Sequence, residues 1–221
     1  MLTIDHPLAG SPAFVAIGDE LVEVVRFLSG RGWTPATSSN FSALVPGYAD
    51  AVAISRSGVD KASFCLDDVM LVDRAGRNLW PEAAKSSAET LIHTALYDLF
   101  DCGAVLHTHS VSATAVSLMA SRAGSITFSG LELLKGLSGI TTHEASVVVP
   151  IFPNDQDMVR FAAMLREELR DRTVYGFLIA GHGVYTWGHT LRDARRHLEV
   201  FEFLFELALH MERFNGHTHD S

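Results

Sequence analysis

The sequence has few cysteines, few clustered basic residues and no hydrophobic run long enough to span a membrane. Its two cysteines, Cys65 and Cys102, can form at most one disulfide, which excludes a disulfide framework and makes the reducing cytoplasm the expected location. Residues 1–14 lack the basic start and apolar core of a signal peptide. The net charge of −9 argues against nucleic acid or an anionic membrane surface as a partner.

Motifs that define several common enzyme classes are also missing. The sequence contains no G-x-G-x-x-G fingerprint, no Walker loop and no G-x-S-x-G nucleophile elbow. Nucleotide binding and serine-hydrolase chemistry therefore lose most of their support.

The chain is long and apolar enough for one sizeable core, with 221 residues of which 48% are hydrophobic. We expect a single domain over residues 1–221, with a mobile tail from about residue 214. Apolar spacing predicts helices over 14–33, 87–100, 112–120, 157–171 and 191–211, and strands or hairpins over 40–47, 50–58, 68–80, 104–109, 146–152 and 175–188. Because hairpins are frequent, a mixed or antiparallel sheet covered by helices is favoured over a parallel doubly wound sheet.

Two histidines end the apolar stretch "AVLHTH". In a strand, His107 and His109 lie on the same face, and each ring needs a polar partner. A divalent metal satisfies both, although hydrogen bonds from strand-end histidines to the backbone are a simpler alternative. His182, between Gly181 and Gly183 after "FLIA", is the best third ligand. Three protein ligands and one open position are typical of catalytic zinc.

The other histidines have simpler explanations. His93 lies at helical spacing from Glu89 and is more often a satisfied helix residue than a ligand. His143 is a weaker candidate, because the H-E-x-x-H pattern is absent. His217 and His219 repeat the H-x-H spacing without an apolar strand, which indicates a frayed tail.

A metal enzyme that acts on a sugar needs a group that moves protons, and two glutamates are candidates. Ser86-x-x-Glu89 fits a capping box, which needs no function, but Glu89 could also lean from the first turn of a helix toward the metal. Glu132, in "FSGLELLKGL", is by pattern alone a surface carboxylate. The pattern leaves both open.

Three short polar stretches, 37–42, 55–61 and 85–87, could hold a phosphate through backbone N–H groups, hydroxyls and a helix N-terminus. Each alone is an ordinary loop, but three of them with a metal site favour a phosphorylated substrate. The candidate phosphate-binding residues are Ser39, Asn40, Ser57, Gly58, Lys61, Ser86 and Ser87.

The blocks "KSSAETLIHTALY", "AVLHTHS" and "GHGVYTWG", followed by a long helix, resemble the class II aldolase/adducin family over about residues 40–205. The resemblance implies an α/β fold with three layers (α/β/α) around a central, largely antiparallel sheet. It also implies a homotetramer with active sites at subunit interfaces, and Zn²⁺ bound by His107, His109 and His182.

Within the family, "HTHS", "LELLKGL" and "GHGVYTWG" are most similar to members that dehydrate 5-methylthioribulose 1-phosphate to 2,3-diketo-5-methylthiopentyl 1-phosphate in methionine salvage. This resemblance implies a zinc-dependent lyase with Glu132 as the acid/base, whereas the aldolase members imply Glu89. One alternative is an aldolase that cleaves a ketose 1-phosphate such as fuculose 1-phosphate. Another is a metal-free, adducin-like structural module, against which the three intact histidines argue.

Overall fold

The computed structural model describes residues 6–217, with side chains described as far as Phe214. The helices are α1 (Pro12–Gly30), α2 (Thr90–Leu99), α3 (Val111–Met119), α4 (Met158–Glu168) and α5 (Leu191–His217). The strands are β1 (Asn40–Val45), β2 (Tyr48–Ser55), β3 (Val69–Asp73), β4 (Asn78–Trp80), β5 (Ala104–Thr108), β6 (Ser125–Ser129), β7 (Ser146–Phe152), β8 (Gly176–Ile179) and β9 (Gly183–Gly188). Short 3₁₀ helices are η1 (Leu66–Asp68), η2 (Ser121–Ala123) and η3 (Glu132–Gly136).

The described strands form one nine-stranded sheet in the order β4-β3-β2-β1-β5-β9-β8-β7-β6. Neighbouring strands are antiparallel except β7 and β8, which run parallel. The central strands β1, β5 and β9 therefore come from both halves of the chain. The predicted largely antiparallel sheet is confirmed.

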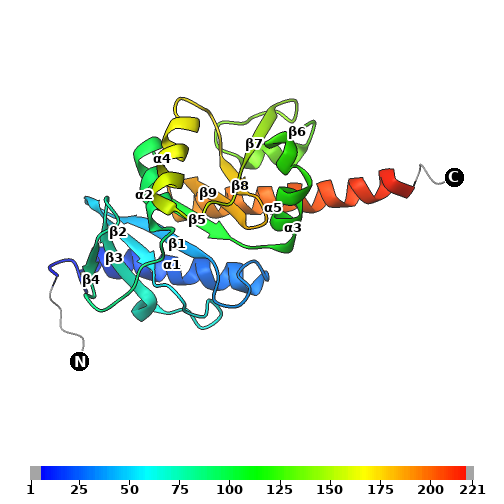
Figure 1. Cartoon of the computed structure of the whole chain (residues 1–221). Coiled ribbons are helices and arrows are strands. Elements are labelled where there is room, and N and C mark those ends of the chain that lie inside the picture. The colour runs from blue at the N-terminus through cyan, green and yellow to red at the C-terminus, as the bar shows by residue number, and fades with distance from the viewer. Residues whose placement is uncertain (1–5, 218–221) are drawn as a thin grey trace.

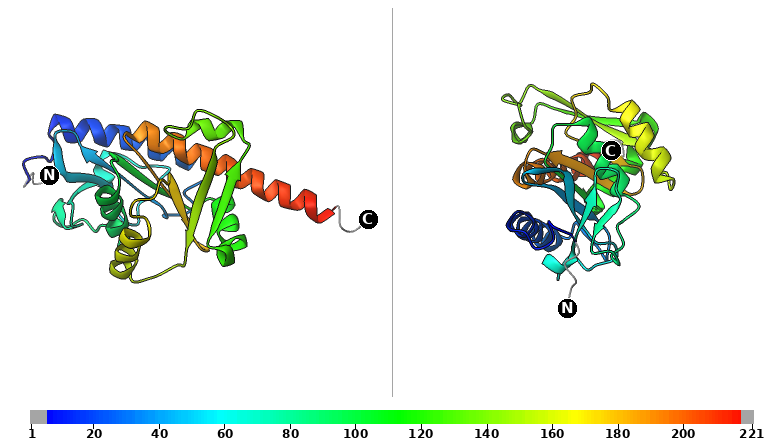
Figure 2. Two further views of the ribbon diagram at one scale, coloured as in Figure 1. Left: turned by 90° about the horizontal axis from the view of Figure 1, so that it is seen from above. Right: turned by 90° about the vertical axis from the view of Figure 1, so that its left-hand side faces the viewer.

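Helices cover both faces of this sheet (Figures 1 and 2). One core cluster joins α1 and α5 to one face, through residues such as Leu21 and Phe201. A second cluster joins α2 and α4 to the other face, through residues such as Ile92 and Phe161. The α3 helix contributes Ala113 to the first cluster and contacts α5. The predicted three-layer α/β/α architecture is confirmed.

Local signals explain several helix starts. Ser11 caps α1 by accepting a hydrogen bond from the backbone N–H of Phe14, and Pro12 follows at the first helical position. Asp157 caps α4 by accepting from the N–H of Arg160 at 3.0 Å. None of the described helices is long and apolar enough to cross a membrane.

The structure differs from the sequence prediction at three places. The capping box of Ser86 and Glu89 does not form, because α2 begins at Thr90 and the Glu89 side chain makes no cap hydrogen bond. Strand β6 was not predicted. The last helix continues to His217, past the predicted start of the tail, and its final turns project away from the body (Figure 1). His219 lies outside the described residues.

Candidate metal centre and phosphate pocket

Cross-strand register places the first predicted ligand in a row of polar side chains. His107 on β5 is paired with Asn40 on β1 and with Tyr185 on β9. Side chains directly opposite one another in an antiparallel sheet lie on the same face. The ring of His107 stacks on that of Tyr185, with the ring centroids 4.0 Å apart and the planes 10° apart. The row faces α2, because Val105, two residues before His107, packs in the cluster that contains this helix.

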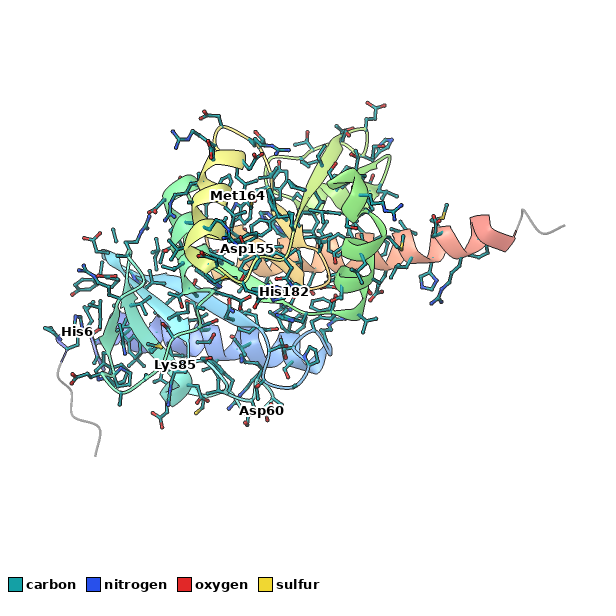
Figure 3. All side chains as sticks on the ribbon, viewed as in Figure 1. His6, Asp60, Lys85, Asp155, Met164 and His182 are labelled. Atoms are coloured by element: carbon teal, nitrogen blue, oxygen red, sulfur yellow. The ribbon has the colours of Figure 1, made fainter. Side chains whose placement is uncertain are left out.

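The third predicted ligand lies on a tight turn between β8 and β9. Gly181 has a φ of +66°, which favours glycine, and a Cβ atom on Gly183 would lie 2.1 Å from the carbonyl oxygen of Thr108. Helix α3 fixes this turn, because Thr114 donates a hydrogen bond to the carbonyl of His182 at 3.0 Å. Figure 3 shows His182 near the middle of the molecule.

The structure brings the three histidines together. The ring centroids lie 4.5 Å apart for His107 and His109, 4.6 Å for His109 and His182, and 5.0 Å for His107 and His182. One nitrogen from each ring lies within 4.8 Å of the other two. No other histidine of the described residues belongs to such a cluster.

The donor set fits a divalent cation. Nδ1 of His107 donates to the carbonyl oxygen of Val184 at 2.9 Å, which leaves the lone pair of Nε2 toward the site. Nε2 of His107, Nε2 of His109 and Nδ1 of His182 are buried and have no hydrogen-bond partner among the described residues. Burial lowers the pKa of His109 to about 4 and that of His107 well below its ordinary value. Neutral rings with unused lone pairs are what metal coordination requires.

Glu89 lies in contact with two of these rings. Its Oε1 atom is 3.1 Å from Nε2 of His182 and 3.6 Å from Nε2 of His107, and its Oε2 atom accepts a hydrogen bond from Asn40. Burial raises the pKa of Glu89, but the two histidines and the Asn40 amide lower it by more, so the carboxyl group stays ionised. Glu89 can therefore hold negative charge beside a bound cation.

Glu132 lies elsewhere on the surface of the single chain. It begins η3, its side chain is 73% exposed, and it pairs with Lys135 and lies 3.9 Å from His143. The hydrogen bond from Lys135 lowers the pKa of Glu132. The chain alone thus brings Glu89, and not Glu132, to the three histidines.

A cavity of about 110 Å³ adjoins the histidines. The predicted phosphate-binding residues that line it, together with Glu89 and His109, are Ser39, Asn40, Ser57, Gly58 and Ser87. Ser39 has a φ of +75°, which is uncommon for a residue with a Cβ atom, and its buried hydroxyl has no partner among the described residues.

Two predicted phosphate-binding residues do not line this cavity. Lys61 is 1% exposed, and its ammonium group donates to the carbonyl of Val59 at 2.9 Å and to that of Thr37 at 3.4 Å. Lys61 therefore stabilises the wall of the cavity. Ser86 lines a separate hollow beside α2 and Met158.

Two residues of this site were missed in the sequence. Arg56 lines the cavity beside Ser57, and its Nε atom is buried without a partner among the described residues. Its position directly before Ser57-Gly58, in a predicted phosphate-binding stretch, could have identified this basic residue from the sequence. Tyr185 supports the ring of His107, which only the pairing of β5 with β9 reveals.

Comparison with known proteins agrees with this fold. The sequence matches the class II aldolase and adducin N-terminal domain over residues 19–209, and the chain belongs to this family. It is 48% identical over 194 residues to the methylthioribulose-1-phosphate dehydratase of Methylococcus capsulatus, covering 87% of this chain and 92% of that protein. It is 50% identical to the dehydratase of the same name from Pseudomonas syringae pv. syringae, covering 87% and 93%.

Solved structures show the same fold. The l-fuculose-1-phosphate aldolase of Thermus thermophilus superposes with a TM-score of 0.72 at 23% identity, covering 92% of this chain and 98% of that one. An aldolase II superfamily protein from Pseudomonas syringae gives a TM-score of 0.75 at 23% identity, covering 93% and 79%.

Proposed function

We propose that this protein dehydrates 5-methylthioribulose 1-phosphate to 2,3-diketo-5-methylthiopentyl 1-phosphate, as a zinc-dependent lyase of methionine salvage. The observation that carries the proposal is the similarity, at 47–50% identity over most of the chain, to proteins named methylthioribulose-1-phosphate dehydratase. The three converging histidines and the adjoining polar cavity support it. The proposal includes a cytoplasmic homotetramer built from this single-domain chain.

His107, His109 and His182 would hold the zinc ion. Zinc bound there would act as a Lewis acid on the substrate carbonyl, which acidifies the neighbouring C3–H bond. The ionised Glu89 lies against two of the rings and keeps negative charge at the site. The phosphate would occupy the adjoining cavity, where Arg56 and Ser57 supply a positive charge and a hydroxyl group.

Proton transfer is assigned to Glu132. Its carboxylate takes the proton from C3, and the resulting carboxylic acid returns that proton to the C4 hydroxyl as the C4–O bond breaks and water leaves. The remaining enol becomes the 2,3-diketone. Because Glu132 is 73% exposed and is not among the residues that its own chain gathers at the three clustered histidines, it would act at the site of a neighbouring subunit in the homotetramer.

Product analysis tests the proposed reaction. Incubation with 5-methylthioribulose 1-phosphate and zinc should give a product lighter by one water with every carbon retained, measured by mass spectrometry. A triose phosphate from this or another ketose 1-phosphate would instead identify an aldolase. Purified protein that contains no zinc and binds none would favour the adducin-like structural module.

Replacement of Glu132 by glutamine should lower kcat by about a hundredfold or more, because general acid–base groups contribute factors of that size. Zinc content should stay unchanged, because Glu132 contacts no histidine of the metal cluster. The measurement is kcat together with bound zinc per chain. Glu144→Gln, on the same exposed surface segment, is the matched control and should retain full activity. Full turnover by Glu132→Gln would remove Glu132 from this role.

A further inference from the structure

A chain of buried polar side chains leads away from the candidate metal centre. Asn40 donates a hydrogen bond to Glu89 and also bonds Nε2 of His93. Nδ1 of His93 lies 2.7 Å from the hydroxyl of Ser42, which lies 2.8 Å from the hydroxyl of Tyr97. Four of these residues are at most 5% exposed, and Glu89, at the end beside the histidines, has a side chain that is 17% exposed. Residues of β1 and α2, with Glu89 directly before α2, thus form one continuous network.

When the His93 ring is neutral, one direction of hydrogen bonding satisfies every member of this network. The Asn40 side chain directs its NH₂ group to Oε2 of Glu89 and its amide oxygen to Nε2 of His93. That oxygen needs a donor, so His93 carries its proton on Nε2 and accepts on Nδ1 from Ser42. Ser42 then accepts from Tyr97. The orientation of the Asn40 amide therefore sets the tautomer of a histidine in the core.

The ring of His93 is neutral in this arrangement. It is fully buried, and burial lowers its pKa to about 4. A protonated ring would donate from both nitrogens, so the Ser42 hydroxyl could no longer donate to Nδ1 of His93. A neutral histidine is thus the group that links an acceptor on one side to a donor on the other.

We infer that His93 is a positioning residue for the metal centre. It locks the Asn40 amide, and through that amide it holds the Glu89 carboxylate against His107 and His182. The expected effect on kcat rests on the proposed function. The expected effect on metal binding does not. A hydrophobic residue of similar size would fill the same space and would leave the amide of Asn40 free to turn.

The tautomer of His93 is the first test and needs no variant. Nitrogen-15 chemical shifts of the histidine rings in the metal-free protein at pH 7 should show a neutral His93 ring protonated at Nε2. A ring protonated at Nδ1, or a charged ring, would overturn the inference.

Zinc affinity is the second test, measured by chelator competition. His93→Phe should weaken zinc binding and lower kcat by about tenfold each, because groups that orient a metal site contribute at least that much. His93→Gln, whose amide can still donate to Asn40, should recover both to within about twofold. Unchanged zinc affinity in His93→Phe, or no recovery in His93→Gln, contradicts the role.

The matched control is His197→Phe. His197 is also buried, at 3% exposed, but it bonds the carbonyl of Trp187 and the side chain of Ser138, away from the cluster. This variant should keep wild-type zinc affinity to within about twofold, which separates loss of a buried ring from loss of the network. Neither the tautomer nor the zinc affinity involves a sugar phosphate. A protein with the expected tautomer and zinc affinities but no dehydratase activity would therefore refute only the proposed function.

Discussion

His182→Ala should lose bound zinc and turnover together, because it removes one of three converging imidazoles. Lewis-acid stabilisation is worth several kcal/mol, which corresponds to about a thousandfold or more in kcat/KM. The measurements are zinc per chain after dialysis and kcat/KM with zinc present. His182 is the best ligand to replace, because its side chain is 16% exposed whereas that of His107 is fully buried in the core.

His189→Ala is the control for this experiment. His182 directly precedes β9 and His189 directly follows it. The side chain of His189 is 66% exposed and lies 3.8 Å from Asp101. Its replacement should leave zinc content and activity at wild-type levels. A His182→Ala protein that still holds one zinc per chain would show that the three histidines do not form the metal site.

Glu202→Gln should make the protein more stable above neutral pH. Glu202, on α5, is 1% exposed, and neither carboxyl oxygen has a hydrogen-bond partner among the described residues. Burial raises its pKa to about 7, while the nearby hydroxyls of Ser110 and Thr108 lower it by less. The folded protein therefore holds this proton more tightly than the unfolded chain does.

The sign of the effect follows from proton binding. Below about pH 4.5 the carboxyl group is protonated in both states, so it does not change stability. As pH rises to about 7 the unfolded chain ionises first, and the free energy of unfolding falls by about 3 kcal/mol at 1.36 kcal/mol per pKa unit. Above that range the loss is constant. Glutamine keeps the shape of the side chain and does not ionise.

Urea unfolding at pH 4.5 and pH 8 measures this difference. Glu202→Gln should match the wild type at the lower pH and exceed it by up to about 3 kcal/mol at the higher pH. Glu212→Gln, at an exposed position of the same helix, should change stability little at either pH. A Glu202→Gln protein less stable than the wild type at pH 8 would mean that the ionised carboxylate is stabilised in the fold.

The sequence was sufficient for the parts of the structure that depend on local pattern. Alternation in "AVLHTH" placed His107 and His109 on one face, and glycines marked the turn that carries His182. Apolar spacing located α5, which begins at Leu191 as predicted but ends at His217, later than predicted. The family resemblance supplied the layered sheet, which local pattern left between mixed and antiparallel.

Contacts that depend on register could not be predicted. His93 was correctly interpreted as a satisfied helix residue, but its partner Asn40 is 53 residues away and becomes a neighbour only when β1 packs under α2. Tyr185 supports His107 for the same reason. Of the two alternatives left open for Glu89, the capping box does not form, and contacts with His182 and Asn40 hold the side chain instead. A residue that completes the site of another subunit, as proposed for Glu132, cannot be placed at that site from a single chain.

The placement of the three histidines would also determine when a cation could bind during folding. His107 lies on β5, His109 follows one residue after its end, and His182 lies on the turn before β9, so the site is complete only after these two strands have paired. A cation bound by the three histidines would therefore favour the native state over forms in which these two strands have not paired. Metal uptake would therefore report the pairing of β5 with β9.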